Sequence, residues 1–346
     1  MVFEVVHYGN DPHGAGGIAS VLRRHLARDL DGIGVSSVVT YRQDAKSFVH
    51  RWTPLGPAIW DVCRRSRSTV VHCHLSQRGS FVREGLVALV GRLTGHAVVV
   101  TLHGSSISSL PVLSRRVVRL SLSFVNRVHG FSDAYRTALG IPAKTWVTIP
   151  NDVEIPPADE IVAKRRLLLF AGEVGTRKGA DILADALSHL AGTIGSWNLV
   201  IAGETAAGFR FSAQQESTLG QDDRIQLAGF LGHGELLALM STAGVLVQPS
   251  RAEAFPMSVC EAMARGCCVV GSKVGAMGEL LAAAGQVLVD PMEPLTLASA
   301  LGGLMASPHE IAERGHRARR FAETHLAPMV VNQAWRQVYL GIRASV

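Results

Sequence analysis

The stretch GVLVQPSRAEAFPMSVCEAMARGCCVV, residues 244–270, is the most informative part of this chain. Its apolar start, residues 244–247, has the composition of a strand that is buried on both faces of a parallel sheet. Pro256 suits the first position of a helix, because its missing N–H would have no partner there. The stretch therefore predicts a strand, a turn that holds Glu253, a helix that holds Glu261, and a second parallel strand.

The same alternation of strands and helices runs along the rest of the 346 residues. The expected strands are FEVVHY, VSSVVT, TVVHCHL, AVVVTLH, RVHGF and WVTI in the first half, and RLLLFAG, WNLVIAG, RIQLAG, GVLVQP, CVVGS and QVLVD in the second. This pattern predicts an α/β protein with two Rossmann-like, doubly wound parallel sheets. The proline-rich connection IPNDVEIPPADEIVAK separates an N-terminal domain, residues 1–151, from a C-terminal domain, residues 152–327. A last helix is expected from about Pro328 to Arg343.

The two halves of the chain differ in charge. Residues 1–150 contain 18 Lys and Arg against 8 Asp and Glu, a balance of +10, whereas the rest contains 16 against 20, a balance of −4. The basic half favours an acidic partner, such as a polyphosphate ligand or an anionic membrane surface. Its arginines are not interleaved with aromatic residues, and no zinc-finger or RNA-binding signature is present, so we expect no nucleic acid partner.

Targeting signals and cysteine usage predict the compartment. No apolar stretch reaches the roughly 18 to 20 residues that span a bilayer, and the start MVFEVVHYGN lacks the features of a secretory signal. The five cysteines form no C-x-x-C pair and fall mostly within apolar segments, so we interpret them as small buried hydrophobic residues. We expect a cytoplasmic protein, with peripheral attachment of the basic half to the inner face of the membrane as the alternative.

A basic turn forms the second informative motif. FAGEVGTRKGADILADAL, residues 170–187, places Arg177 and Lys178 after a strand and at the start of a helix. Two cations and a helix N-terminus can hold a diphosphate and neutralise the charge that develops as a phosphate ester breaks, without a metal ion. Taken alone, such a turn would be interpreted as an ordinary solvated surface.

Five motifs together resemble glycosyltransferase family four over essentially the whole chain. They are EAFP with EAMARG at 253–266, the basic turn, TLHG at 101–104, IPN at 149–151 and GAGGIA at 14–19. The resemblance implies the GT-B fold, in which two domains face each other across a cleft, and a retaining, metal-independent transferase of hexosyl groups. It also implies that the last helix, about 328–346, packs back on the N-terminal domain and that a hinge lies near Asn151.

The resemblance also assigns roles to individual residues. Glu253 would contact the hydroxyls of the donor sugar, and Glu261 would contact the ribose. The residues expected to be catalytic are His103, Arg177, Lys178 and Glu253. The expected donor-binding residues are Gly16, Gly17, Gly172, Asn151, Ala254, Phe255, Pro256 and Glu261, and the acceptor-side residues are His13, Gly14 and Arg78.

By resemblance, the donor is a nucleoside-diphosphate sugar bound by the C-terminal domain. The acceptor, bound by the N-terminal domain, is a glycan, a lipid-linked molecule or a small molecule, and no cofactor or metal is needed. The leaving diphosphate would help to deprotonate the acceptor hydroxyl on the same face of the sugar, so no enzymic nucleophile is required. The R-G-S-F stretch at 78–81 occurs in relatives associated with polysaccharide assembly, which favours exopolysaccharide, cell-envelope glycan or glycoconjugate biosynthesis. An equally good interpretation of this stretch is the basic start of a helix that binds no ligand.

One residue departs from the family pattern. Glu173 stands where the family often has an arginine after the glycine at the end of the strand. A carboxylate does not bind a phosphate, so either Arg177 supplies the missing cation or the donor binds more weakly. This departure supports a second hypothesis, in which the chain is a catalytically idle relative that serves as a nucleotide-sugar-binding scaffold or as a partner subunit.

Two other enzyme classes compete with the transferase. Two carboxylates could hydrolyse a glycosidic bond, but cations and a phosphate-type turn are superfluous for a neutral oligosaccharide. GAGGIA also matches the dinucleotide fingerprint of NAD(P)-dependent oxidoreductases. However, NDPH lies between it and the first strand, and no acid ends the second strand, so the fingerprint lacks its context.

Two patterns contain the residue types of a metal site. Asp29-Leu30-Asp31 has the D-x-D form found in metal-dependent transferases, but it follows a helix, where exposed acids are ordinary. His72 and His74 share one face of a strand, but no third ligand follows at a matching spacing. We therefore expect no metal site and interpret both histidines as buried or cleft-side polar residues.

Overall fold

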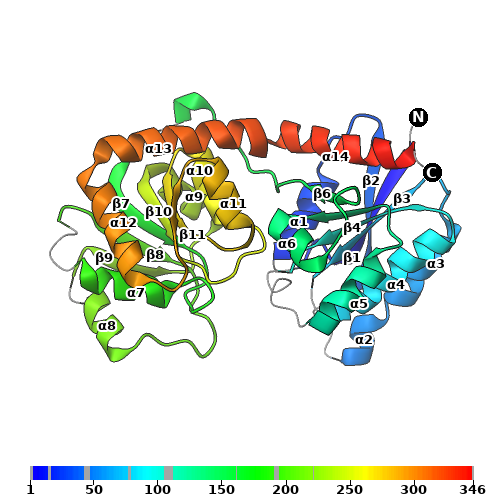
Figure 1. Ribbon diagram of the computed structural model, residues 1–346, viewed down its shortest axis with the longest axis horizontal. Helices are drawn as coiled ribbons and strands as arrows, with labels where there is room; N and C mark the ends of the chain where they lie inside the picture. The colour runs from blue at the N-terminus through cyan, green and yellow to red at the C-terminus, as the bar shows by residue number, and fades with distance from the viewer. Residues whose placement is uncertain are drawn as a thin grey trace. The chain divides into compact units, whose positions relative to one another are not determined.

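The computed structural model describes residues 3–14, 17–42, 47–76, 79–104, 112–160, 162–190, 195–220 and 222–344. The chain divides into two compact units: unit 1 comprises residues 1–151 and 328–346, and unit 2 comprises residues 152–327. Within the described ranges, each unit contains one six-stranded parallel sheet between layers of helices (Figure 1).

The strands of unit 1 are β1 (Phe3–Asn10), β2 (Ile33–Tyr41), β3 (Val70–Leu75), β4 (Ala97–Leu102), β5 (Arg127–Gly130) and β6 (Trp146–Thr148). Its helices are α1 (Gly17–Leu26), α2 (Phe48–Trp52), α3 (Leu55–Arg64), α4 (Gly79–Leu93), α5 (Val112–Leu122), α6 (Asp133–Leu139) and α14 (Pro328–Arg343).

The strands of unit 2 are β7 (Arg165–Ala171), β8 (Asn198–Ala202), β9 (Ile225–Gly229), β10 (Ala243–Gln248), β11 (Cys268–Ser272) and β12 (Val287–Val289). Its helices are α7 (Ala180–His189), α8 (Ala213–Gly220), α9 (His233–Thr242), α10 (Met257–Ala264), α11 (Gly275–Ala283), α12 (Pro294–Ala306) and α13 (Pro308–Phe321), with short segments η2 (Ala158–Glu160) and η3 (Ala322–Leu326).

Each sheet is covered on both faces, which explains its nearly continuous apolar strands. On β1, Val6 and Tyr8 contribute to a core with α3, α4, α5 and α6, whereas Val5 packs in a separate core with Trp335 and Tyr339 of α14. In unit 2, the side chains of β7 alternate in the same way between a core with α7 and α12 and a core with α9, α10 and α11.

The order of the strands creates a ligand-binding position in each sheet. Unit 1 has the order β2-β1-β3-β4-β5-β6, and unit 2 has the order β12-β11-β10-β7-β8-β9. In unit 2 the chain moves from β7 to one side through β8 and β9, then returns to the other side at β10. Ligands of such sheets bind outside the carboxyl ends of the strands at this switch point, which lies between β7 and β10.

Every strand expected from the sequence overlaps an observed strand, and the α/β fold class with two parallel sheets is confirmed. The expected position of Pro256 is wrong by one residue, because α10 begins at Met257. The carbonyl of Pro256 accepts the N–H of Cys260 at 3.1 Å, but its φ of −87° and ψ of 80° are not helical.

The expectation of uniformly buried cysteines is wrong for Cys63. Cys63 is exposed, whereas the other four cysteines are buried. Ala58 and Val62 turn the buried face of α3 inward, and the next residue on a helix is rotated by about 100° away from that face. Among the described residues, no helix combines the length and the apolar character needed to cross a membrane.

Candidate functional site

The two motifs singled out in the sequence leave the sheet of unit 2 from the same edge. β7 ends at Ala171 and continues through the basic turn into α7, while β10 ends at Gln248 and continues through the Glu253 turn into α10. The two strands are parallel neighbours, with Leu169 paired to Leu246. Both turns therefore lie at the switch point of the sheet, the position where this fold class binds its ligands.

Lys178 and Glu253 meet directly at this point. Nζ of Lys178 donates to Oε1 of Glu253 at 2.5 Å, and their side chains are only 14% and 5% exposed. Oγ of Ser250 donates to the same carboxylate oxygen at 2.9 Å, and Nε2 of Gln248 donates to Ser250 Oγ at 2.9 Å. Two of the residues expected to be catalytic thus form one buried, hydrogen-bonded ion pair.

Two glycines allow the close packing of the basic turn. Gly179 has a φ of +77°, and a Cβ there would lie 2.0 Å from the carbonyl oxygen of Pro249. Gly172 has a φ of +152°, and a Cβ there would lie 3.5 Å from Cε of Lys178. Side chains at these positions would therefore be strained or would press on the neighbouring turn.

Arg177 lies beside the buried pair in sequence but has a different environment. Its Nε is 3.6 Å from Oε1 of Glu173, and both side chains are about half exposed. Glu173, the departure from the family pattern, therefore sits next to the cation that was expected to compensate for it. At this exposure the pair contributes little to stability, so a stronger anion can displace Glu173.

Arg251 is a residue of this site that the sequence reasoning missed. Its guanidinium forms two hydrogen bonds of 2.7 Å with the carboxylate of Asp181, in the first turn of α7. Its backbone N–H donates to the carbonyl of Arg177 at 2.9 Å, and its side chain also contacts the carbonyl of Thr176. Arg251 therefore fixes the basic turn to the Glu253 turn. The one signal in the sequence is its place two residues before Glu253.

The remaining donor-side residues surround the start of α10. Glu253 and Glu261 are both buried, at 4% and 8% exposure. Ala254 and Phe255 are half-buried in the turn, and Phe255 packs against the core beneath α10. Glu261 lies in the second turn of α10, and helical side chains lean toward the N-terminus of their helix.

The expected site residues of unit 1 lie in several separate segments of the chain. His103 follows the end of β4, is half-buried, and donates its backbone N–H to the carbonyl of Leu75 at 2.8 Å. His13 is exposed, and the N–H of Gly14 donates to the carbonyl of Asp11 at 3.1 Å. Asn151 is buried at the end of the first part of unit 1. Gly17 begins α1, whereas Gly16 and Arg78 lie outside the described residues.

A third histidine lies near His72 and His74, although none follows them in the sequence at a matching spacing. His7 pairs with His72 across the parallel strands β1 and β3, and side-chain nitrogens of His7, His72 and His74 lie within 4.8 Å of one another, close enough to share a metal ion. The sequence spacing did not reveal this, because the register between strands far apart in the chain is not visible in the sequence. Asp31 of the D-x-D pattern pairs instead with Arg336 of α14 at 3.0 Å.

Burial favours the neutral form of five histidines of unit 1. It lowers the pKa of His7 and of His103 to about 3 and that of His129 to about 4, with a nearby positive charge or a second histidine adding to the effect. Burial also lowers the pKa of His72 and of His74 well below the usual value. His103 is therefore uncharged near neutral pH and offers hydrogen bonds rather than a positive charge.

A chain of four hydrogen bonds with one fixed direction runs through the sheet of unit 1 and ends at Tyr339 of α14. Nε2 of His129 lies 2.8 Å from the carbonyl oxygen of Ile149, which only accepts, so Nε2 carries the proton of neutral His129 and Nδ1 accepts. Oγ1 of Thr101 therefore donates to that Nδ1 at 3.0 Å and accepts from Nε2 of His72 at 2.7 Å. Nδ1 of His72 then accepts a hydrogen bond from the hydroxyl of Tyr339 at 2.8 Å.

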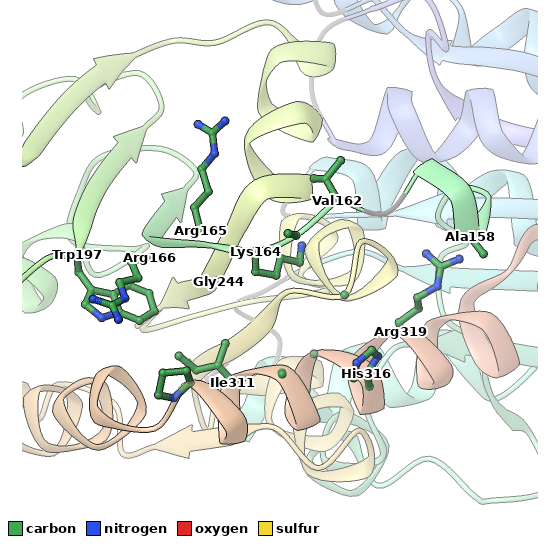
Figure 2. Close-up of a pocket in the computed structure, with 15 residues that line it drawn as sticks. Ala158, Val162, Lys164, Arg165, Arg166, Trp197, Gly244, Ile311, His316 and Arg319 are labelled. Atoms are coloured by element: carbon green, nitrogen blue, oxygen red, sulfur yellow. The ribbon is translucent and has the colours of Figure 1, made fainter.

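A cavity of about 700 Å³ lies elsewhere in unit 2, at the amino ends of β7 and β10 (Figure 2). Lys164 reaches into this region, but its Nζ donates to the carbonyls of Met240, Ser241 and Arg265 at 2.7–3.1 Å. These carbonyls end α9 and follow α10, so Lys164 caps the negative ends of two helices, and burial lowers its pKa. The role of Lys164 at this cavity is therefore structural.

Comparisons with known proteins identify relatives of this chain in sequence and in fold. Residues 152–323 match the family model described as glycosyl transferases group 1. The chain is 25% identical over 253 residues to a phosphatidylinositol N-acetylglucosaminyltransferase subunit from Arabidopsis thaliana, a match that covers 68% of this chain and 54% of that protein. It is 30% identical over 212 residues to glycogen synthase from Mycobacterium tuberculosis, a match that covers 59% of this chain and 47% of that protein. The chain thus spans about half the length of the curated relatives it matches.

Solved structures match the chain over nearly its full length. Anabaena HepE in complex with UDP has 19% identity and a TM-score of 0.77, covering 100% of both chains. Sucrose-phosphate synthase from Thermosynechococcus elongatus has 20% identity and a TM-score of 0.76, covering 99% of this chain and 100% of that chain. The fold is that of the GT-B glycosyltransferases, as the sequence predicted. The chain belongs to the glycosyl transferases group 1, through the family match of its second unit.

Proposed function

We propose that this chain transfers a hexosyl group from a nucleoside-diphosphate sugar to an acceptor hydroxyl, with retention of configuration at the anomeric carbon. The buried pair of Lys178 and Glu253 at the switch point of unit 2 is the observation that carries the proposal. A cation held by a carboxylate in a poorly hydrated turn is suited to a ligand that presents both anionic oxygens and hydroxyl groups. The similar HepE structure was solved in complex with UDP, which supports this class of donor.

Lys178 and Glu253 would each form further hydrogen bonds when the nucleoside-diphosphate sugar binds. The ammonium group of Lys178 has three N–H donors, so it can keep Glu253 and also bind a diphosphate oxygen. The second oxygen of Glu253 would accept a hydrogen bond from a hydroxyl of the sugar. Arg177 would leave its ion pair with Glu173 and bind the diphosphate instead. Glu261 would contact the ribose. These two cations would stabilise the charge on the leaving group, so the proposal includes no metal ion or other cofactor.

In the reaction, the bond between the anomeric carbon and the phosphate oxygen breaks as the bond to the acceptor oxygen forms on the same face. The departing phosphate oxygen takes the proton of the acceptor hydroxyl, so no side chain becomes covalently attached. Unit 1 would bind the acceptor, a glycan, a lipid-linked molecule or a small molecule, and its balance of +10 over residues 1–150 favours an anionic acceptor or contact with an anionic membrane. The setting would be polysaccharide or glycoconjugate biosynthesis in the cytoplasm.

The proposal is tested by the release of nucleoside diphosphate from a panel of nucleoside-diphosphate sugars. Lys178→Met and Glu261→Ala should each lower kcat/KM by at least about a hundredfold, because each would remove a contact to the donor. Lys273→Ala is the matched control, since Lys273 forms a 3.1 Å pair with Asp290 on the surface of the same unit. Release that is unchanged in both site variants would overturn the assignment of the site.

The idle scaffold remains a second candidate because Glu173 places a carboxylate beside Arg177. The same panel separates the two functions when it is combined with measurement of donor binding. A chain that binds a nucleotide-sugar in a Lys178-dependent way, but releases no diphosphate with any acceptor class, would be the scaffold.

A further inference from the structure

Three histidines of unit 1 form a second hydrogen-bonded chain, separate from the one that ends at Tyr339. Nε2 of His103 lies 2.8 Å from Nδ1 of His74, and Nε2 of His74 lies 2.8 Å from Nδ1 of His7. His74 and His7 are 2% and 1% exposed, on the sheet face that α14 covers. The chain therefore connects a half-buried residue beyond the end of β4 to the interior of the unit.

The chemistry of neutral imidazole restricts this chain to two proton arrangements. Each neutral ring has one N–H and one bare nitrogen, and each hydrogen bond needs one of each. If His74 carries its proton on Nδ1, it donates to Nε2 of His103 and accepts from Nδ1 of His7. If it carries the proton on Nε2, both bonds reverse. In either arrangement all three rings have the same tautomer.

We propose that His74 and His7 are positioning residues that tie the tautomer of His103 to their own, so that Nδ1 of His103 presents to the ligand the polarity that the shared tautomer gives it. This inference rests on the proposed function only for the identity of the ligand, the donor sugar. Because Nε2 of His103 is used by His74, Nδ1 is the ring nitrogen left to face a hydroxyl group, as a donor in the first arrangement and as an acceptor in the second.

The hydrogen bonds favour this chain over a metal site at His7, His72 and His74. Both ring nitrogens of His74 are used by the two neighbouring histidines, and those of His72 are used by Tyr339 and Thr101. A metal ion would have to replace at least one of these bonds on each ring. The same bonds satisfy both rings without an ion, which a buried polar group requires.

The tautomers can be measured directly by NMR of protein in which the histidines carry a stable nitrogen isotope. The nitrogen and proton signals of each ring show which of its nitrogens carries the proton. We expect His7, His74 and His103 to be neutral near about pH 7 and to share one tautomer. Signals are assigned from single substitutions of each histidine. Different tautomers among the three rings, a charged ring at that pH, or a stoichiometric metal ion in the purified protein would overturn the proposal. This measurement does not depend on turnover.

A pair of variants at His7 tests whether the chain acts on His103. His7→Leu removes the far end of the chain, so His103 should populate both tautomers and kcat should fall on the order of tenfold with little change in donor KM. His7→Asn keeps a hydrogen-bonding group and should restore most of the rate. His50→Leu, at an exposed histidine in α2 of the same unit, is the control.

An unchanged His103 tautomer in His7→Leu would overturn the proposal, even if the rate falls. A shared tautomer in a protein without transferase activity would instead leave the histidine chain intact and reject the proposed function. If His7→Leu does not fold, the wild-type tautomers and His7→Asn still decide the question.

Discussion

Lys178 and Glu253 are buried charges that depend on each other. Lys178→Met leaves the carboxylate of Glu253 buried without this cation, so we expect the free energy of unfolding to fall by about 3 kcal/mol. Lys178→Met combined with Glu253→Gln removes both charges and should stay within about 1 kcal/mol of the wild type. Urea denaturation measures all three proteins. A double variant as unstable as the single one would show that the pair is not coupled.

Gly179 is a second residue whose chemistry is set by its surroundings. Gly179→Ala would combine a φ of +77° with a Cβ placed 2.0 Å from the carbonyl oxygen of Pro249, so we expect a loss of at least about 2 kcal/mol and weaker donor binding. Gly234→Ala is the control, because Gly234 lies in α9 and a Cβ added there would have nothing within 4 Å. That change should be neutral or stabilising by up to about 1 kcal/mol. Equal melting temperatures would contradict the close approach at Gly179.

At the scale of elements, α14 is attached to the sheet of unit 1 by a directional hydrogen bond. Tyr339→Phe leaves Nδ1 of His72 as a buried acceptor without its donor, and we expect a loss of about 1–3 kcal/mol. Trp335 of the same helix packs in one core with Val5 of β1 and should keep α14 in place, so the overall fold should survive. Chemical denaturation provides the measurement. A change within about 0.5 kcal/mol would show that another group satisfies His72.

The sequence predicted these elements well because both faces of each sheet are covered. Strands such as β7 and β10 are therefore apolar throughout, and Pro328 marks the start of α14. The resemblance to a family assigned Lys178 and Glu253 to one ligand, but their direct contact was not predicted. Arg251 and His7 were missed because their partners depend on strand register and turn geometry, and no local pattern encodes either of these.

At the scale of the whole molecule, acid should destabilise unit 1 before unit 2. The pKa of His7 is about 3 in the folded protein, whereas its usual value is 6.5. As the pH falls below about 6.5, the unfolded chain therefore binds more protons than the folded protein does. The contribution of such a histidine is fully present above about pH 6.5 and is lost as the pH falls, by up to about 1.4 kcal/mol per pH unit. His103 and His129 shift in the same direction.

Unit 2 provides the internal comparison for this prediction. Its histidines all lie on the exposed surface: His189, His233, His309, His316 and His325. Limited proteolysis at about pH 5 and about pH 7, with the fragments mapped by mass spectrometry, should show acid-dependent cleavage in unit 1 first. Cleavage that begins in unit 2 would contradict the role of the buried histidines.

Binding of a donor diphosphate at the switch point of unit 2 can be measured by hydrogen–deuterium exchange with and without saturating uridine, guanosine, adenosine or thymidine diphosphate. With the nucleotide that binds, we expect slower exchange in residues 172–180 and 249–261. Protection confined to the other edge of the same sheet, around the cavity lined by Lys164 and Arg319, would contradict this expectation.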